Sequence, residues 1–270
     1  MSGYWFKFGG TYSYDLGIIV DGTPNVEIAQ RDFEMVNIPG KNGSDYIDNG
    51  RYNNVSFARN IALVQKGSST VSYKIDALIN AFAYLQGYQP FEDSDHSALM
   101  TYAVLTNLGE VSRDLRRLGR ATLRFSRQPF WYAKGGLSPI ELDSDLMMAG
   151  VNIRNMFPAD AQPIYKFVLN SGKSTTNYFR LQIGSFVNAY PLSFLKYYID
   201  GTNSRRYITF DCENKEIKAQ STEEGGNIAY SSAVALPPDL KFGIDTTIKI
   251  TENNNNCLLS MSITPRWRCL

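Results

Sequence analysis

The chain has 270 residues, of which 43% are hydrophobic and 13% aromatic, and its formal net charge is +1. This length suits one large or two ordinary domains with well-buried cores. The near-neutral charge argues against strong nonspecific attraction to nucleic acid or to anionic membranes. We find no signal peptide and no apolar run of membrane-spanning length, so we expect no membrane insertion. Cys212, Cys257 and Cys269 are far apart, which is typical of free thiols in a reducing compartment.

The first part of the chain predicts short strands and tight turns. Two turn signals, Pro-Gly-Lys-Asn-Gly at 39–43 and Asp-Asn-Gly at 48–50, enclose the strand-like run 44–47. Asn-Gly and Asp-Asn-Gly accept positive φ at low cost, so these signals predict two chain reversals in a β-meander at the surface. The next segment, 55–64, alternates apolar and polar residues as a strand does. Arg59 interrupts its apolar set, which indicates either a bulge or a charge that faces a partner.

The hydrophobic period then changes to that of a helix. A stripe with spacings of four, three, one, three and three residues predicts one amphipathic helix. Its members are Val71, Ile75, Leu78, Ile79, Phe82 and Leu85. Ser68, Ser69 or Thr70 is suited to cap its start, and Gly87 to end it. We expect Leu78 and Phe82 to be buried against a sheet.

The rest of the chain again predicts strands. Residues 102–108 and 121–126 complete a first domain, residues 1–135, which we expect to be a β-sandwich or split barrel with one helix. Residues 136–162 are rich in Gly, Pro and acidic side chains and predict a linker or domain boundary with some extended structure. From 163 to 270, strand-like runs recur between turn signals, which predicts a second, C-terminal β-sandwich. The predicted fold class is therefore mostly β.

Three short motifs occur in order along the chain, and together they resemble the signature of the distal tail proteins of long-tailed, non-contractile (siphovirus-type) phages. The first covers the two turn signals, the second follows the strand 121–126, and the third ends the chain. No long insertion interrupts them. The residues that carry the resemblance are Pro39, Gly40, Asn42, Gly43, Gly50, Arg51 and Tyr52; Pro129, Phe130 and Tyr132; and Pro265, Arg266 and Trp267.

The resemblance implies an N-terminal belt domain and a galectin-like C-terminal β-sandwich. It implies a structural, non-enzymatic virion protein of the tail tip or baseplate, assembled in the host cytoplasm as a homo-oligomeric ring, typically a hexamer. The ring would link the tail tube protein to the tail fibre or tail-associated lysin and dock receptor-binding proteins, while the DNA passes through it. A ring needs a heterologous interface, and we expect exposed strand edges of the belt sheet to supply it.

Patterns for catalysis or cofactor binding are weak. His96, the one histidine, lies in a polar stretch, and no Gly-x-Ser-x-Gly elbow occurs, so we expect an exposed loop histidine rather than a catalytic one. One histidine and scattered cysteines do not supply the usual zinc sets, and we expect no cofactor or metal. Gly172-Lys173-Ser174 is no P-loop, because Phe167 stands where the motif needs a glycine.

Other polar groups leave alternatives open. The acid pairs Asp143/Asp145 and Glu223/Glu224 suit a glycosidase, although such pairs in Gly-rich loops are more often solvated. A run of arginines suits phosphate binding, but a solvated face or pairing with a neighbouring subunit is favoured. That run is Arg113, Arg116, Arg117, Arg120, Arg124 and Arg127.

The position of the Trp267 side chain distinguishes two possible functions of the second sandwich, protein docking and sugar binding. We expect its ring to pack inward, with the neighbouring Arg266 and Arg268 left in water, rather than to form a sugar platform. A carbohydrate-binding module in the second sandwich is therefore the alternative function. A glycosidase is less favoured still.

Overall fold

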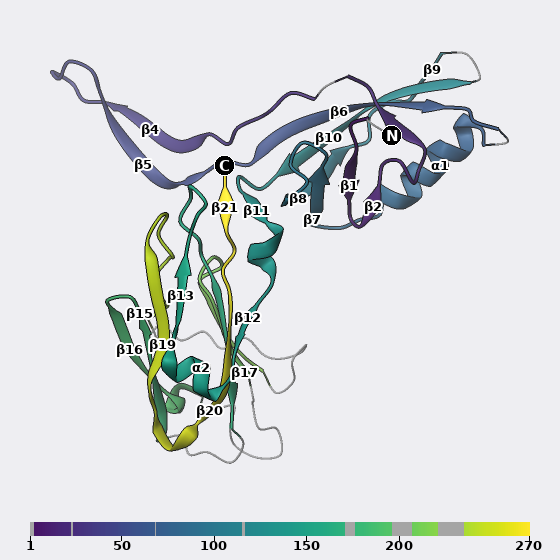
Figure 1. The fold of residues 1–270 in the computed structure, drawn as a ribbon. Coiled ribbons are helices and arrows are strands. Elements are labelled where there is room, and N and C mark those ends of the chain that lie inside the picture. The colour runs from purple at the N-terminus through teal and green to yellow at the C-terminus, as the bar shows by residue number, and fades with distance from the viewer. Residues whose placement is uncertain are drawn as a thin grey trace. The chain divides into compact units, whose positions relative to one another are not determined.

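The computed structural model describes residues 3–22, 24–67, 69–114, 117–170, 176–195, 207–220 and 235–270 (Figure 1). The chain splits into two compact units, Met1–Tyr132 with Leu270, and Ala133–Cys269. Strands dominate both, which confirms the predicted mostly-β class. Within these ranges, no helix has the length and apolar character needed to cross a bilayer.

The first unit is built on an antiparallel sheet that curls into a half-barrel. Its end strands are joined by a short turn in which the Ile18 N–H donates to the Ser13 carbonyl at 3.0 Å, so the curl brings the two ends together. In spatial order its strands are β2 (Thr11–Tyr12), β1 (Phe6–Phe8), β7 (Gln89–Asp93), β8 (Leu99–Asn107), β10 (Leu118–Arg127), β6 (Val55–Val64) and β3 (Ile18–Val20). Two short strands lie off this path, β9 (Ser112–Asp114) beside β10 and β11 (Trp131–Ala133) beside β8.

The core of the first unit lies between this sheet and helix α1 (Val71–Phe82). The Tyr73 N–H donates to the Thr70 hydroxyl at 3.2 Å, so Thr70 is the N-cap that the sequence offered. Leu78 and Phe82 are buried, as predicted. The ring of Phe82 lies edge-on to that of Phe8, with centroids 5.5 Å apart, so the helix is held by aromatic packing.

We predict that Phe82→Ala lowers the free energy of unfolding of the first unit by about 3–5 kcal/mol, because it leaves a cavity in a close-packed core. Urea denaturation of the full chain measures this loss. Tyr84→Ala is the matched control, since Tyr84 is exposed just beyond the helix and its loss costs less than about 0.5 kcal/mol. Equal effects of the two substitutions would show that the apolar stripe does not pack on the core.

The second unit is a sandwich of two antiparallel sheets. One sheet contains β12 (Ile140–Leu142), β20 (Leu258–Thr264), β14 (Ile164–Leu169), β17 (Tyr207–Asp211) and β18 (Glu216–Gln220). The other contains β13 (Val151–Arg154), β19 (Asp245–Asn253), β15 (Tyr178–Ile183) and β16 (Phe186–Pro191). Phe167 of the first sheet packs on Phe179 of the second at 4.9 Å between ring centroids, so one core joins the layers.

The stretch predicted as a linker, 136–162, holds regular structure and counts with the second unit. It contains the second half of the 3-10 helix η1 (Lys134–Leu137), then β12, α2 (Ser144–Ala149) and β13. The sequence did not predict helix α2 because it is too short to show a helical period of apolar residues. Asp143 caps it by accepting from the N–H groups of Asp145 and Leu146, so this acidic stretch serves a helix start. The unit's remaining short elements are η2 (Leu192–Leu195), η3 (Asn254–Asn256) and β21 (Arg268–Cys269).

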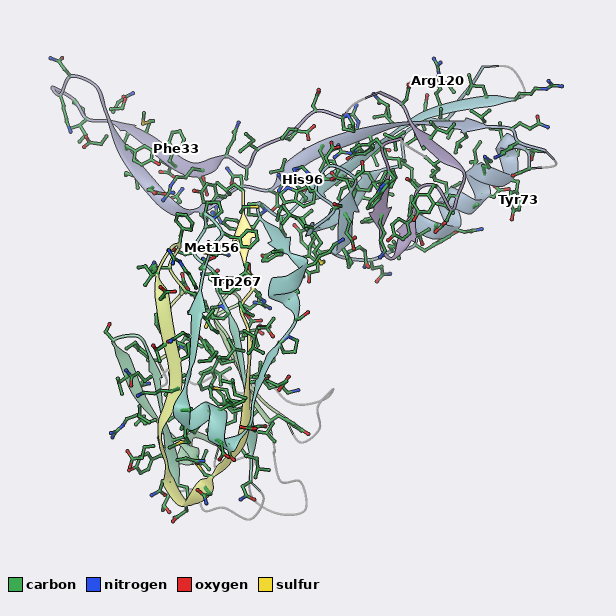
Figure 2. The ribbon with its side chains drawn as sticks, in the orientation of Figure 1. Phe33, Tyr73, His96, Arg120, Met156 and Trp267 are labelled. Atoms are coloured by element: carbon green, nitrogen blue, oxygen red, sulfur yellow. The ribbon has the colours of Figure 1, made fainter. Side chains whose placement is uncertain are left out.

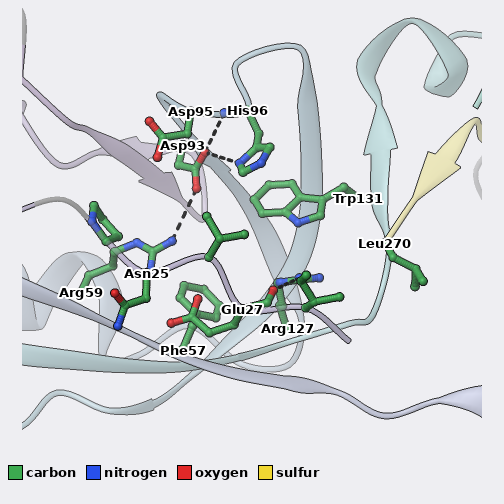
Figure 3. A pocket seen from close by; sticks show the side chains of 13 residues that line it. Asn25, Glu27, Phe57, Arg59, Asp93, Asp95, His96, Arg127, Trp131 and Leu270 are labelled. Atoms are coloured by element: carbon green, nitrogen blue, oxygen red, sulfur yellow. Dashed lines mark hydrogen bonds and ion pairs between the residues drawn. The ribbon is translucent and has the colours of Figure 1, made fainter. Parts of the chain in front are cut away.

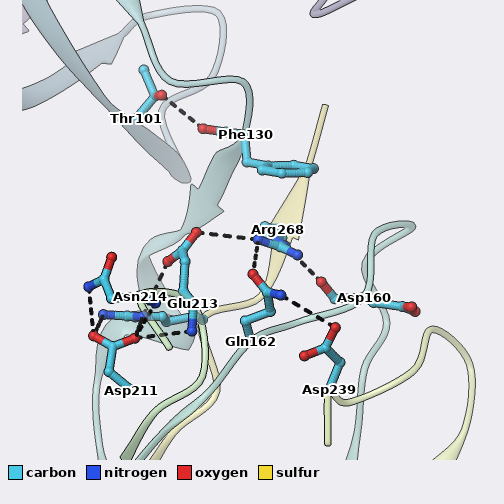
Figure 4. A network of polar contacts seen from close by, with 10 residues as sticks. Thr101, Phe130, Asp160, Gln162, Asp211, Glu213, Asn214, Asp239 and Arg268 are labelled. Atoms are coloured by element: carbon cyan, nitrogen blue, oxygen red, sulfur yellow. Dashed lines mark hydrogen bonds and ion pairs between the residues drawn. The ribbon is translucent and has the colours of Figure 1, made fainter. Parts of the chain in front are cut away.

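The end of the second unit is pinned by ion pairs (Figure 4). Arg266, in a left-handed conformation at φ 55°, donates from its two terminal nitrogens to the two carboxylate oxygens of Asp211 at 2.7 and 3.1 Å. Arg268 is buried and donates to the Asp160 carbonyl and to Gln162. The expectation that both arginines stay in water is therefore wrong, because carboxylates and carbonyls of the same unit face them.

Burial raises the pKa of Asp211, but hydrogen bonds from Arg266 and Asn214 outweigh it and hold the pKa below 3.8. A carboxyl whose pKa is depressed by folding stabilises the fold above its unfolded-state pKa, and that contribution is lost as the pH falls through the folded-state pKa. The second unit should therefore lose stability as the pH falls below about 5 and through the lowered pKa of Asp211.

We predict that Asp211→Asn makes this loss smaller than in the wild type, as measured by urea denaturation at several pH values. Asp245→Asn is the control, because Asp245 is exposed and its pairing with Arg154 at 3.7 Å contributes little. Parallel pH profiles for the wild type and Asp211→Asn would contradict the assigned role of the ion pair.

Candidate assembly site: an exposed arm and its root

Two strands of the first unit form a hairpin of their own, which we call the arm (residues 31–52; Figure 1). Strand β4 (Arg31–Asn37) pairs antiparallel with β5 (Ser44–Tyr52), and the chain reverses between them as the first turn signal predicts. Gly40 and Gly43 both have φ of 83° there, a conformation that glycine adopts without strain.

The predicted second reversal at 48–50 is wrong. These residues belong to β5, and the pairing passes from Arg31↔Tyr52 to Phe33↔Asp48, so extra residues bulge out of one strand. Gly50 has φ of 70°, and its N–H donates to the Asp48 carboxylate at 2.8 Å. The sequence signal was ambiguous because a glycine at positive φ serves a bulge as well as it serves a turn.

Ion pairs across the arm hold its bulged end in register. Arg31 Nε donates to the Asp48 carboxylate at 2.7 Å, and Arg51 pairs with Asp32. These hydrogen bonds from the arginines hold the pKa values of Asp48 and Asp32 below 3.8. Exposed ion pairs of this kind contribute little to stability. Their role is to favour this register of the two strands.

The arm carries apolar side chains that its own two strands cannot bury (Figure 2). On one face, Phe33, Met35 and Tyr46 are 47%, 62% and 52% exposed, and the rings of Phe33 and Tyr46 touch at 5.1 Å between centroids. Val36 and Ile47 are exposed on the other face. A two-stranded hairpin alone is marginally stable in water, and exposed apolar strands favour association. The arm therefore has the composition of an interface.

The root of the arm brings the first two motifs together. The Asn53 N–H donates to the Gln30 carbonyl at 2.8 Å and closes the hairpin. The ring of Tyr52, from the first motif, meets that of Phe130, from the second, edge to face at 5.6 Å. The Phe130 carbonyl in turn accepts from the Thr101 hydroxyl at 2.8 Å (Figure 4).

A cavity of about 60 Å³ lies beside the root, under the segment 24–28 that approaches the arm (Figure 3). Arg59 reaches it from the inward face of β6 and is buried, where it pairs with Asp93 at 3.5 Å and donates to the Tyr4 hydroxyl at 3.1 Å. Burial of Tyr4 raises the pKa of its hydroxyl. Both expectations for Arg59, a bulge or a charge turned to a partner, are therefore wrong.

His96 lines the same cavity and is half-buried rather than an exposed loop residue. Its Nδ1 lies 3.1 Å from the Asp93 carboxylate, and its ring stacks on Trp131 with centroids 4.7 Å apart. The residues that line the cavity carry no hydroxyl or thiol that a histidine–carboxylate pair could activate as a nucleophile. The arrangement is that of a packed polar network.

The remaining predicted residues are dispersed. Arg117, Arg120 and Arg124 are exposed, whereas Arg127 is buried. Cys212 and Cys257 are buried free thiols, and burial raises the pKa of Cys212 to about 12. The side chains of Arg113 and Arg116, the pair Glu223/Glu224 and Gly172-Lys173-Ser174 lie outside the described part of the chain.

The third motif lies in the second unit. Trp267 is partly buried and packs on the sandwich core. Its backbone carbonyl accepts from the Ala133 N–H at 2.8 Å. A Cβ added at Gly136 would lie 2.6 Å from the Trp267 ring, so only glycine fits beneath it.

No protein-family model and no curated protein matches the chain. Among solved structures, the Dit protein of phage SPP1, described as a paradigm of the hub adsorption apparatus of phages that infect Gram-positive bacteria, has a TM-score of 0.65 at 15% identity over 99% of both chains. Two structures of the phage P2 baseplate in its activated conformation, with Ca and with Sr, score 0.48 and 0.46 at 7% and 8% identity, over 96% of this chain and 97% of theirs. The chain therefore has the fold of the phage distal tail (Dit) proteins, the family that its three motifs resemble.

Proposed function

We propose that this protein is a structural subunit of a phage tail tip, where copies of it form a ring, expected to be a hexamer, that links the tail tube to the tail fibre or lysin. The fold it shares with the SPP1 hub protein supports this role. The observation that carries the proposal is the arm, because a ribbon with apolar side chains on both faces needs a cover.

A second copy of the chain is the cover that fits a ring. An arm that is offered by one copy and received by a different surface of the next makes a heterologous contact, and such contacts close into rings. We expected exposed edges of the belt sheet to supply this contact. Among the described strands, β2 and β3 end the curled sheet, and the two strands of the arm pair only with each other, so both sheets offer such edges. Burial of a side chain such as Phe33 contributes about 1.5–3 kcal/mol to a contact.

We predict that the double variant Phe33→Ser, Tyr46→Ser raises the apparent dissociation constant for self-association at least about a hundredfold, because two apolar contacts are lost. Size-exclusion chromatography with light scattering over a range of concentrations measures the change. Tyr73→Ser is the control, since Tyr73 is an aromatic residue more exposed than Phe33 or Tyr46 but lies on α1. A double variant that assembles as the wild type does, or a wild type that stays monomeric, contradicts the proposed ring.

The second unit carries a surface that suits docking of a receptor-binding protein. Met156, Phe242 and Ile244 are exposed on two neighbouring segments, joined by a backbone bridge between Asn155 and Phe242 (Figure 2). The buried side chain of Asn155 donates to the carbonyls of Ala159 and Leu240 at 2.8 and 3.1 Å. Apolar groups on such a fixed backbone lose little entropy on binding, which favours a protein contact.

We predict that virions carrying Met156→Ser with Phe242→Ser still form the ring but lose receptor-binding protein, as counted by quantitative mass spectrometry of purified particles. Leu259→Ser, an equally exposed residue of β20, is the control. If the purified wild type instead binds a wall polysaccharide saturably and this variant does not, the second unit is a carbohydrate-binding module.

A further inference from the structure

The segment that leads into the arm makes little apolar contact with the body of its unit and is held to it by polar contacts as well. This segment, residues 24–30, which we call the strap, forms no helix or strand. Its two large apolar side chains, Val26 and Ile28, are 73% and 69% exposed. Ala29 is buried, but its side chain is a single methyl group, so apolar packing fixes the segment only weakly. It passes over the cavity of about 60 Å³ and not over a close-packed core. Something else must therefore fix its path.

Arg127, the last residue of β10, contacts the strap. Its Nη2 donates to the Glu27 carbonyl at 2.9 Å, a contact between residues one hundred positions apart in sequence. Its Nη1 donates to the carbonyls of Gln128 and Pro129 at 3.0 and 2.8 Å. The guanidinium also lies 5.3 Å from the centre of the Trp131 ring. One buried guanidinium thus joins the strap to residues 128 and 129. Figure 3 shows Arg127 and Glu27 of the strap at the same cavity.

The other end of the arm contacts the same short segment. Tyr52 is the last residue of β5, and its ring packs edge-on against Phe130 at 5.6 Å. The chain therefore enters the arm beside Arg127 and leaves it beside Phe130, three positions later. We call residues 127–130 the anchor segment.

We propose that the anchor segment fixes the direction in which the arm leaves its unit, with Arg127 as the positioning residue for the entering strand and Phe130 for the leaving strand. This inference rests on the proposed ring, because a fixed direction matters where each arm must meet the next copy. An arm that samples many directions is competent for docking only part of the time, and the apparent dissociation constant rises by the inverse of that fraction. A lysine would not replace Arg127, since one ammonium lacks the planar fork that serves both sides.

The test measures the direction of the arm in the monomer. Spin labels are placed on cysteines introduced at Asn42, near the arm's tip, and at Tyr84, an exposed position beyond α1, in a Cys269→Ser background that removes the one cysteine that is not fully buried. Dipolar spectroscopy of dilute protein then gives the distribution of distances between the labels. We expect a narrow distribution for the wild type and a broader one for Arg127→Met and for Phe130→Ala.

Arg124→Met is the matched control, because Arg124 lies on the same strand but is exposed. It should keep the narrow distribution. In light scattering of unlabelled protein, Arg127→Met and Phe130→Ala should raise the apparent dissociation constant about tenfold, whereas Arg124→Met should leave it unchanged.

The possible outcomes test the anchor proposal and the ring proposal separately. Narrow distributions in Arg127→Met and Phe130→Ala overturn the anchor, whatever the oligomeric state. A wild type that never associates overturns the ring, while the distance distributions still decide the anchor. If thermal unfolding shows that Arg127→Met does not fold, Phe130→Ala and Arg127→Lys decide in its place, and a narrow distribution in both contradicts the proposal.

Discussion

A two-stranded ribbon cannot bury apolar side chains on both of its faces, and this constraint governs how the first unit is to be understood. The half-barrel and α1 complete a core of their own, closed by aromatic contacts such as Phe8 on Phe82. The arm takes no part in that core, and its apolar residues Phe33 and Met35 stay in water. Exposed apolar ribbons favour association, because contact with another molecule removes their faces from water.

The interior of the first unit is polar beside the root of the arm. Arg59 and Arg127 occupy inward positions of the neighbouring strands β6 and β10, where apolar residues would pack with less cost. The cost of burying the charge of Arg59 is offset by its ion pair with Asp93 and its hydrogen bond to the Tyr4 hydroxyl. For Arg127, hydrogen bonds to backbone carbonyls offset the same cost. Buried charges of this kind favour one arrangement over others by their geometry more than they add stability. Here that arrangement includes the strap.

The elements of this fold were predictable where a hydrophobic pattern repeats over many residues. The alternation over 55–64 predicted β6, and the stripe over 71–85 predicted α1, because burial on one side imposes a period of 2 or 3.6. The helix ends at Phe82, so Leu85 lies beyond it and is exposed, and the stripe missed Lys74 on the buried face. Signals carried by a few residues were ambiguous. Gly50 marks a bulge and not a turn, and α2 is too short to show a period.

The candidate site was predictable in part. The first two motifs were visible as separate pieces of sequence, but their meeting through Tyr52 and Phe130 depends on pairing between strands far apart in the chain. One signal was present and could have been used: Arg59 and Arg127 fall on the apolar parity of their strands, which places both inside. The surface position of this hairpin was predicted, but the exposure of its apolar side chains was not, since apolar residues on both faces are equally typical of a buried strand.

The central claim is that the arm of one copy is covered by another copy, and electron cryomicroscopy of the purified oligomer tests it most directly. The account predicts a closed ring in which Phe33 and Tyr46 of each copy lie against a neighbouring copy. A ring whose arms remain surrounded by solvent, or an oligomer joined through the second unit alone, would contradict it.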